Sequence, residues 1–341
     1  MKIFVSGVAG FLGSHLAESF LNEGHEVIGC DNLIGGELVN VPPDVEFYQY
    51  DCIHHNSMVK ITKGCDIVYH CAATAYEGLS VFSPHVITQN IVGASVSLFS
   101  AAIQNKVKRI VFCSSMARYG TNKPPFEESY VPAPQDPYGI GKLSCEQILA
   151  NLCEVHGTEH VIAVPHNIIG PRQKYDDPFR NVASIMINMM LQGKQPYIYG
   201  DGEQQRCFSF VDDCLYCLKK MATLPSVKGE TINIGPDEEL VTINKLAHEI
   251  ADIIGFDLNP IYVDERPQEV KVATCSANKA RRLLGYKTST TLRQGLTDMV
   301  EFIKKNGVRP FRYHLDIEIV NDKLPVTWRD KLFAKKVEEM V

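Results

Sequence analysis

Length, composition and charge already limit what this chain can be. Its 341 residues are about twice the length of a typical domain, so one large domain or two coupled domains are expected. The 34 lysines and arginines against 40 aspartates and glutamates give a net charge of −6, which argues against a nucleic-acid groove or a polybasic membrane patch. An apolar fraction of 45% excludes a disordered chain. The 11 cysteines, scattered among apolar runs, indicate free thiols in a reducing, cytoplasmic compartment.

The stretch 80–105 comes nearest to a membrane span. It carries Pro84, His85, Gln89 and Asn90, which a hydrocarbon layer tolerates poorly. We therefore expect a buried amphipathic helix here and a soluble protein. Residues 1–5 run directly into an apolar strand, so no targeting segment is expected.

The first half of the chain alternates strand-like apolar runs with helical patterns. A run at 3–6 leads through a glycine-rich turn into a helical pattern that ends before Gly24. Further apolar runs and two more helical patterns follow in order, the runs at 27–30, 45–50, 67–71, 107–113 and 161–164, the helices at 88–104 and 142–153. Continuous apolar strands separated by helices indicate a parallel sheet covered on both faces, in an α/β fold.

After about residue 165 the pattern changes to polar loops between short strands and helices. Helical patterns are expected at 181–191, 212–221, 243–253, 278–284 and 291–304. We predict a sheet domain over 1–165, a smaller mixed α/β lobe over 166–305 that exchanges some elements with it, and a C-terminal extension over 306–341. The extension is expected to be a surface helix or a strap at an interface.

The turn after the first strand has the spacing G-x-x-G-x-x-G and comprises Gly7, Gly10, Phe11, Leu12 and Gly13. Glycines allow a tight turn and let backbone N–H groups approach a pyrophosphate at a helix N-terminus. Its place between a strand and a helix, in the first unit of the chain, is the context in which such a turn binds a dinucleotide. This predicts a Rossmann-type doubly wound sheet.

Acidic residues that follow the next strands indicate which dinucleotide binds. Asp31 closes the second strand, where a carboxylate accepts both ribose hydroxyls of adenosine and repels a 2′-phosphate. Asn32 follows in place of a basic residue. Both favour NAD over NADP. Asp51, after the third strand and just before Cys52, is expected near the adenine.

A tyrosine and a lysine stand four residues apart at a predicted helix start, as Tyr138 and Lys142. A lysine ammonium near a phenol lowers the phenol pKa toward neutrality, so that the tyrosine can act as a general acid or base on an alcohol. Ser115, after the strand at 107–113, adds a hydroxyl that could bind the same substrate oxygen.

With these groups in order, the chain resembles the extended short-chain dehydrogenase/reductase family, in its nucleotide-sugar epimerase/dehydratase branch. The resemblance runs from residue 1 to about 286. Besides the glycine turn it is carried by His70-Cys71-Ala72-Ala73, Asn90, Ser114 to Gly120, Tyr138 to Lys142, Asn167 to Arg172 and Gly200 to Arg206.

The resemblance implies roles for individual residues. Ser115 would be the catalytic serine, Tyr138 the acid/base, and Lys142 a ribose-binding helper, while Ala72, Ala73 and Asn90 would lie at the cofactor. On the substrate side, Asn167 would contact the sugar diphosphate, Arg206 and Arg266 would hold the pyrophosphate, Tyr199 would stack on the base, and Ala273 would line the C2 side of the hexose. A small residue at 273 leaves room for a 2-acetamido group.

The resemblance also indicates the reaction. A 4,6-dehydratase has an Asp-Glu pair directly after the catalytic serine, where this chain has Met116 and Ala117, which transfer no protons. A 4-epimerase needs no further group. We therefore expect an NAD-dependent epimerase of a UDP-hexose or UDP-N-acetylhexosamine. The alternatives are a nucleotide-sugar dehydratase, with 4,6- or unusual 5,6-elimination, and a sensor that kept the fold without the chemistry.

Three further expectations concern partners and metals. In the family, helices corresponding to 88–104 and 142–153 form a homodimer, so a homodimer is expected here. No nucleic-acid or membrane partner is expected. Cys214 and Cys217 form a C-x-x-C on a helical pattern without the paired clusters of a zinc site, so no metal is expected.

Overall fold

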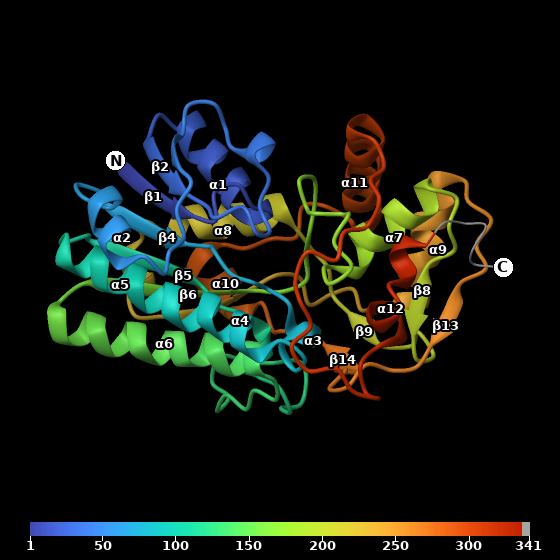
Figure 1. Ribbon diagram of the computed structural model, residues 1–341. Coiled ribbons are helices and arrows are strands. Elements are labelled where there is room, and N and C mark those ends of the chain that lie inside the picture. The colour runs from blue at the N-terminus through green and yellow to red at the C-terminus, as the bar shows by residue number, and fades with distance from the viewer. Residues whose placement is uncertain (336–341) are drawn as a thin grey trace.

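A computed structural model describes residues 1–335. Its centre is a sheet of seven strands in the order β11-β6-β5-β4-β1-β2-β3, and all neighbouring strands are parallel (Figure 1). The predicted doubly wound parallel sheet is confirmed. The strands are β1 (Lys2–Ser6), β2 (Glu26–Cys30), β3 (Glu46–Tyr48), β4 (Ile67–His70), β5 (Arg109–Cys113), β6 (Glu159–Pro165) and β11 (Thr231–Ile234).

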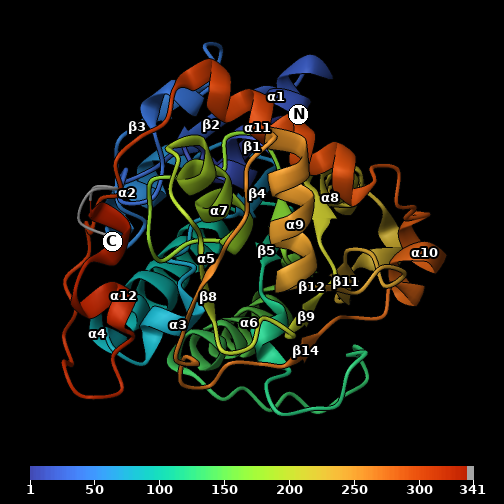
Figure 2. The ribbon, with the colours of Figure 1, turned by 90° about the vertical axis from the view of Figure 1, so that its right-hand side faces the viewer.

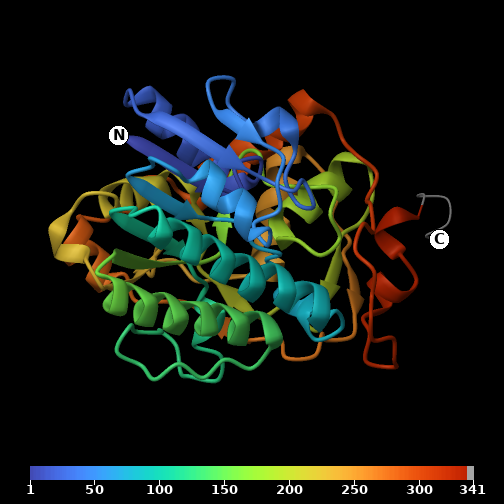
Figure 3. The same ribbon diagram turned by 60° about the vertical axis from the view of Figure 1, so that its left-hand side comes forward.

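Helices cover both faces of this sheet. Side chains of alternate strand residues point to opposite faces, so Phe4 and Val68 enter one core cluster while Ile3 and Tyr69 enter another. The first cluster packs against α2 (His55–Ile61), α5 (Ala94–Gln104) and α6 (Pro137–His156), which lie in front of the sheet in Figure 3. The second packs against α1 (Phe11–Asn22), α8 (Val211–Met221) and α10 (Asn278–Leu284).

Two helices begin earlier than the sequence patterns predict. A continuous helical path runs from α4 (Pro84–Thr88) through a π-helical turn (Gln89–Gly93) into α5. By length and composition alone this path is long and apolar enough to cross a membrane, but core helices of soluble proteins have the same length and composition. Leu98 and Phe99 are fully buried in the core, as expected for the latter. The other helix, α6, begins at Pro137 because Asp136 caps it, accepting the Gly139 N–H at 2.9 Å.

The second lobe has its own core between three helices, α7 (Val182–Leu191), α9 (Ile243–Ile254) and α11 (Leu292–Asn306), which face the viewer in Figure 2. Short strands border it: β7 (Ile168–Ile169) pairs with β10 (Ser209–Phe210), and β8 (Tyr197–Tyr199) with β13 (Ile261–Val263). β9 (Gln205–Arg206) lies between β12 (Val241–Thr242) and β14 (Val272–Ala273). Single helical turns occur at α3 (Glu77–Ser80), η1 (Leu38–Asn40), η3 (Met116–Arg118), η4 (Pro225–Val227) and η5 (Leu332–Ala334).

The chain crosses the predicted boundary at residue 165 more than once. β11 pairs with β6 at the edge of the central sheet, and α8 and α10 cover that sheet, although all three follow residue 165. The predicted exchange of elements therefore supplies the seventh strand and two covering helices. The substrate side of the molecule is in this way anchored directly in the sheet layer.

The C-terminal extension forms a strap across the joint between the lobes. It carries the single turn α12 (Val326–Arg329), in which Trp328 is buried. The Trp328 ring lies 5.3 Å from that of Phe179 and 6.2 Å from that of Phe82. Part of the predicted extension, 336–341, lies outside the described residues.

Candidate active site

A cavity of about 530 Å³ lies where the carboxyl ends of the sheet strands face the second lobe. Open α/β sheets bind ligands at this edge. Every residue expected at the cofactor or the substrate lines this cavity: Gly7, Gly10, Phe11, Leu12, Gly13, Asp31, Asn32, Asp51, Cys52, Ala72, Ala73, Asn90, Ser115, Tyr138, Lys142, Asn167, Tyr199, Arg206, Arg266 and Ala273.

The glycine turn between β1 and α1 is packed so closely that side chains do not fit. Gly7 has φ +73°, and a Cβ on it would lie 2.9 Å from the Cα of Ala72. A Cβ on Gly13 would overlap the carbonyl oxygen of Gly7. Gly10 caps α1 without any side chain of its own. Bare backbone therefore faces the cavity at a helix N-terminus, which fits the pyrophosphate of a dinucleotide.

Asp31 closes β2 beside this turn. Its carboxyl accepts the N–H groups of Leu33 at 2.8 Å and of Ala9 at 3.1 Å. Burial raises the pKa of the carboxyl, and these hydrogen bonds oppose that rise. Close by, Asn32 donates to Asp51 at 2.9 Å. The site thus offers fixed carboxylates where the adenosine of NAD is expected, and the residues present fit that cofactor.

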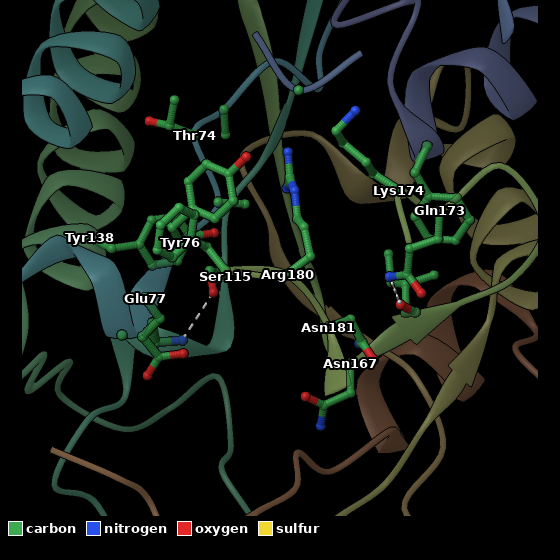
Figure 4. A pocket seen from close by; sticks show the side chains of 18 of the residues that line it. Thr74, Tyr76, Glu77, Ser115, Tyr138, Asn167, Gln173, Lys174, Arg180 and Asn181 are labelled. Carbon is green, nitrogen blue, oxygen red and sulfur yellow. Dashed lines mark hydrogen bonds between the residues drawn. The ribbon is translucent and has the colours of Figure 1, made fainter. Parts of the chain in front are cut away.

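Ser115 and Tyr138 lie on one wall of the cavity (Figure 4). Ser115 Oγ accepts the Ala117 N–H at 3.2 Å, which leaves its own hydrogen free to be donated. Burial raises the pKa of the Tyr138 phenol well above its usual value, while a hydrogen bond with Ser115 opposes the rise. Without a ligand Tyr138 is therefore a neutral phenol at neutral pH.

Lys142 does not have the predicted effect on the pKa of Tyr138. One turn beyond Tyr138, its Nζ donates to the carbonyl of Cys113 at 2.8 Å and lies 4.8 Å from the centre of the Phe112 ring. Burial lowers the pKa of Lys142. The spacing of the two residues predicts that this ammonium lowers the Tyr138 pKa, but burial of the phenol dominates and raises that pKa.

The second lobe contributes polar groups to the opposite side. Asn167 has φ +44° and donates to the carbonyl of Cys207 at 3.0 Å. Glu269 bridges two arginines, at 2.8 Å to Arg206 and 2.6 Å to Arg266. Arg266 also lies over the ring of Tyr199, at 4.8 Å. Glu269 thus holds both guanidinium groups in a fixed pair, an arrangement suited to a diphosphate.

The cavity also has charged and aromatic residues that the sequence did not indicate, among them Tyr76, Glu77, Arg180 and Glu269. Glu77 follows β4 by seven residues, and its place after the carboxyl end of a central strand is the signal that could have found it. Arg180 and Glu269 stand in long polar loops, where charge is ordinary and gives no signal.

Two features of the sequence lie outside the cavity. Arg118 is buried against Glu146, with 2.9 Å between the charged groups, and is not among the lining residues. Cys214 and Cys217 are buried on α8. Within residues 1–335 no three His, Cys, Asp or Glu side chains are grouped as metal ligands would be.

A dinucleotide cradle at the edge of a parallel sheet, with a serine and a tyrosine beside it and an arginine pair opposite, defines a nicotinamide-dependent enzyme acting on a nucleotide-linked alcohol. The chain belongs to the NAD dependent epimerase/dehydratase family, whose model matches residues 3–235. It is an isomerase of nucleotide sugars that uses NAD.

Relatives and solved structures agree with this assignment. A UDP-glucose 4-epimerase of Mycolicibacterium smegmatis is 30% identical over 318 residues, covering 90% of this chain and 100% of the relative. The structure of a UDP-glucose 4-epimerase of Thermotoga maritima with UDP-glucose has 32% identity and a TM-score of 0.84, covering 90% of this chain and 99% of that one. The structure of a UDP-N-acetylglucosamine 4-epimerase of Methanobrevibacter ruminantium with UDP-N-acetylmuramic acid has 31% identity and a TM-score of 0.84. It covers 90% of this chain and 99% of that one.

Proposed function

We propose that this protein is a 4-epimerase of a UDP-hexose or UDP-N-acetylhexosamine. The observation that carries the proposal is the placing of Ser115 and Tyr138 in the same cavity as the Arg206–Arg266 pair. Guanidinium groups that hold a diphosphate would bring the attached sugar toward the hydroxyl pair. The relatives that act on UDP-sugars at C4 support this reading.

The roles of the side chains follow from their contacts. Tyr138 would take the proton from O4 of the sugar, and Ser115 would donate its free hydrogen to the same oxygen. When bound, NAD⁺ supplies the hydride acceptor at C4 and a positive charge that favours the Tyr138 phenolate. Asn167 and the arginines would let the 4-keto sugar turn while its diphosphate stays held.

The surroundings of Ser115 argue against 4,6-dehydration. The two residues after it, Met116 and Ala117, line the cavity and bring no proton-transferring group to it. A dehydratase would have to take its acid and base from residues other than the two that follow the serine. Its product would be lighter by one water, whereas an epimer keeps the mass of its substrate.

Ala273 bears on the sugar. It is 3% exposed, lines the cavity, and lies opposite Arg206 in the β9–β14 pair. A methyl group next to the diphosphate-holding arginine leaves room beside the first carbons of the sugar. This supports a 2-acetamido sugar among the substrates, as in the relative from Methanobrevibacter ruminantium.

The test is to follow the purified protein by NMR with UDP-, dTDP-, GDP- and CDP-linked hexoses and N-acetylhexosamines. A C4 epimer of unchanged mass from the UDP-sugars is expected. A product lighter by one water would replace the proposal with the dehydratase. Inertness of every sugar, with NAD still bound, would favour the sensor.

A further inference from the structure

A glutamate extends into the catalytic end of the cavity. Glu77 lies in the single turn α3, and Figure 4 shows its side chain beside Ser115 and Tyr138, on the wall opposite Asn167 and Asn181. Its charge acts on the Tyr138 phenol and on both Arg206 and Arg266. Glu77 therefore lies within electrostatic reach of both the group that would act at C4 and the groups that would hold the diphosphate.

The Glu77 carboxyl is left without a partner by its neighbours. Arg206 and Arg266, whose charges act on it, are already paired with Glu269. Nowhere in residues 1–335 does a donor make a hydrogen bond to the Glu77 carboxyl. The Glu77 side chain is exposed where it lines the cavity. Its carboxyl is therefore open to whatever fills the cavity.

The environment of Glu77 also suits proton transfer. The pKa of Glu77 is raised to about 7, most strongly by desolvation and also by the charges of Asp136 and Glu269, against the opposing charges of Arg206 and Arg266. Near neutral pH the carboxyl is thus divided between its charged and protonated forms, the state in which one group serves as both base and acid.

We propose that Glu77 is a second acid/base residue that removes and returns a proton at a sugar carbon next to C4. The proposal rests on the proposed function, because a C4 ketone makes the hydrogens on C3 and C5 acidic. A Glu77 carboxylate oxygen takes the proton, the C–H electron pair forms a double bond to C4, and the negative charge moves to O4 beside Tyr138 and Ser115. Return of the proton restores the ketone.

The consequence can be measured, because a simple 4-epimerase returns its own hydride and exchanges no carbon-bound hydrogen with water. The enzyme with NAD and a UDP-hexose in D₂O is therefore expected to incorporate deuterium at C3 or C5 while it epimerises C4, both followed in the same NMR spectrum. Incorporation at either carbon supports the proposal. C4 epimerisation with no deuterium at either would overturn it and leave the proposed function standing; no reaction at C4 would remove the proposed function itself.

Variants locate the exchange in Glu77. E77Q keeps the shape of the side chain and removes its basicity, so the ratio of deuterium incorporation to C4 epimerisation is expected to fall by about 100-fold or more. E301Q, on the exposed face of α11, is the matched control and keeps the wild-type ratio. If E77Q also kept that ratio, Glu77 would do no more than bind the sugar, and the proposal would be wrong.

Discussion

At the scale of single residues, we propose that the small side chain of Ala273 determines which sugars fit. Enlarging it to tyrosine would fill the space beside Arg206 with an aromatic ring. Overfilling a packed site costs about 1–3 kcal/mol, so Ala273→Tyr is expected to lower activity on UDP-N-acetylglucosamine about 10-fold or more relative to UDP-glucose. Ala273→Ser, which stays small, is the control. An unchanged ratio of the two activities in the tyrosine variant would show that residue 273 does not border C2.

Arg180 reaches from the second lobe toward the cofactor side. Its guanidinium lies 4.4 Å from the centre of the Tyr76 ring and 3.4 Å from the Asp177 carboxyl, and its charge opposes the rise in the pKa of Asp31 that burial causes. Figure 4 shows its tip in the middle of the cavity. This position suits a contact with the NAD pyrophosphate.

Removing the charge of Arg180 should weaken the binding of NAD. A charge-assisted hydrogen bond contributes about 1.5–3 kcal/mol, so Arg180→Gln is expected to raise the Kd for NAD about 10-fold or more, as measured by calorimetry. The exposed Arg282 gives a control of equal charge change in Arg282→Gln. Equal NAD affinity in both variants would place Arg180 away from the cofactor.

The sequence predicted much of the site at this scale. The positions of glycines, Ser115, Tyr138 and Lys142 could be predicted because tight turns and helix starts depend on local chain geometry. Glu77 and Arg180 could not, since their meaning comes from which loops meet over the cavity. The prediction that Lys142 lowers the Tyr138 pKa was wrong for a related reason, because spacing along a helix reveals nothing about how deeply the phenol is buried.

At the scale of elements, the C-terminal strap supports the substrate side. Thr327 hydrogen-bonds the hydroxyl of Tyr199, and the Tyr313 hydroxyl donates to the Thr327 carbonyl at 2.5 Å. The Trp328 indole donates to the carbonyl of Pro178 at 3.2 Å. The strap therefore ties the aromatic residue expected at the nucleotide base to the loop that carries Arg180.

Thr327→Val tests this support, because it keeps the volume and removes the hydroxyl. Losing one hydrogen-bond partner costs about 1 kcal/mol, so KM for the UDP-sugar is expected to rise about five-fold while kcat changes little. Steady-state kinetics separates the two constants. A fall in kcat at constant KM would instead link the strap to the chemical step.

Elements of the sheet domain were predictable from apolar runs, and those of the strap were not. The sequence of β11 is that of an ordinary short apolar strand, and only its pairing with β6 shows that it belongs to the central sheet. The strap has no repeating apolar pattern typical of a helix or strand. The sequence around its buried Phe311 and Trp328 therefore does not indicate what these side chains pack against.

At the scale of the whole molecule, the fold keeps a histidine neutral at its centre. His70 is fully buried between the hydroxyls of Ser6, at 2.7 Å, and Ser95, at 2.8 Å. Burial lowers the pKa of His70 from 6.5 to about 3. Because only the unfolded chain takes up this proton, its contribution to stability is present above pH 6.5 and is lost as the pH falls from there toward 3.

The free energy of unfolding is therefore expected to fall between about pH 6.5 and 5.5 by up to about 1.4 kcal/mol through His70 alone. Urea titrations at several pH values measure this. His70→Gln removes the titrating ring, so its stability should depend less steeply on pH over the same range. Parallel pH curves for the two proteins would contradict a neutral, buried His70.

The two lobes contribute different residues to the cavity. The sheet domain carries the residues expected at the cofactor, and the second lobe carries the arginine pair. α5 and α6, the helices expected to pair two copies, lie side by side on one face of the sheet (Figure 3). A homodimer through them, and a cytoplasmic location, stay predictions.

In the reaction that we propose, hydrogen leaves C4 of a UDP-sugar and returns to the same carbon from the other side. A substrate deuterated at C4 tests it most directly, with the product followed by NMR and mass spectrometry in ordinary water. We expect a C4 epimer that retains the deuterium at C4 and keeps its mass. Loss of the label to water, or a product lighter by one water, would contradict it.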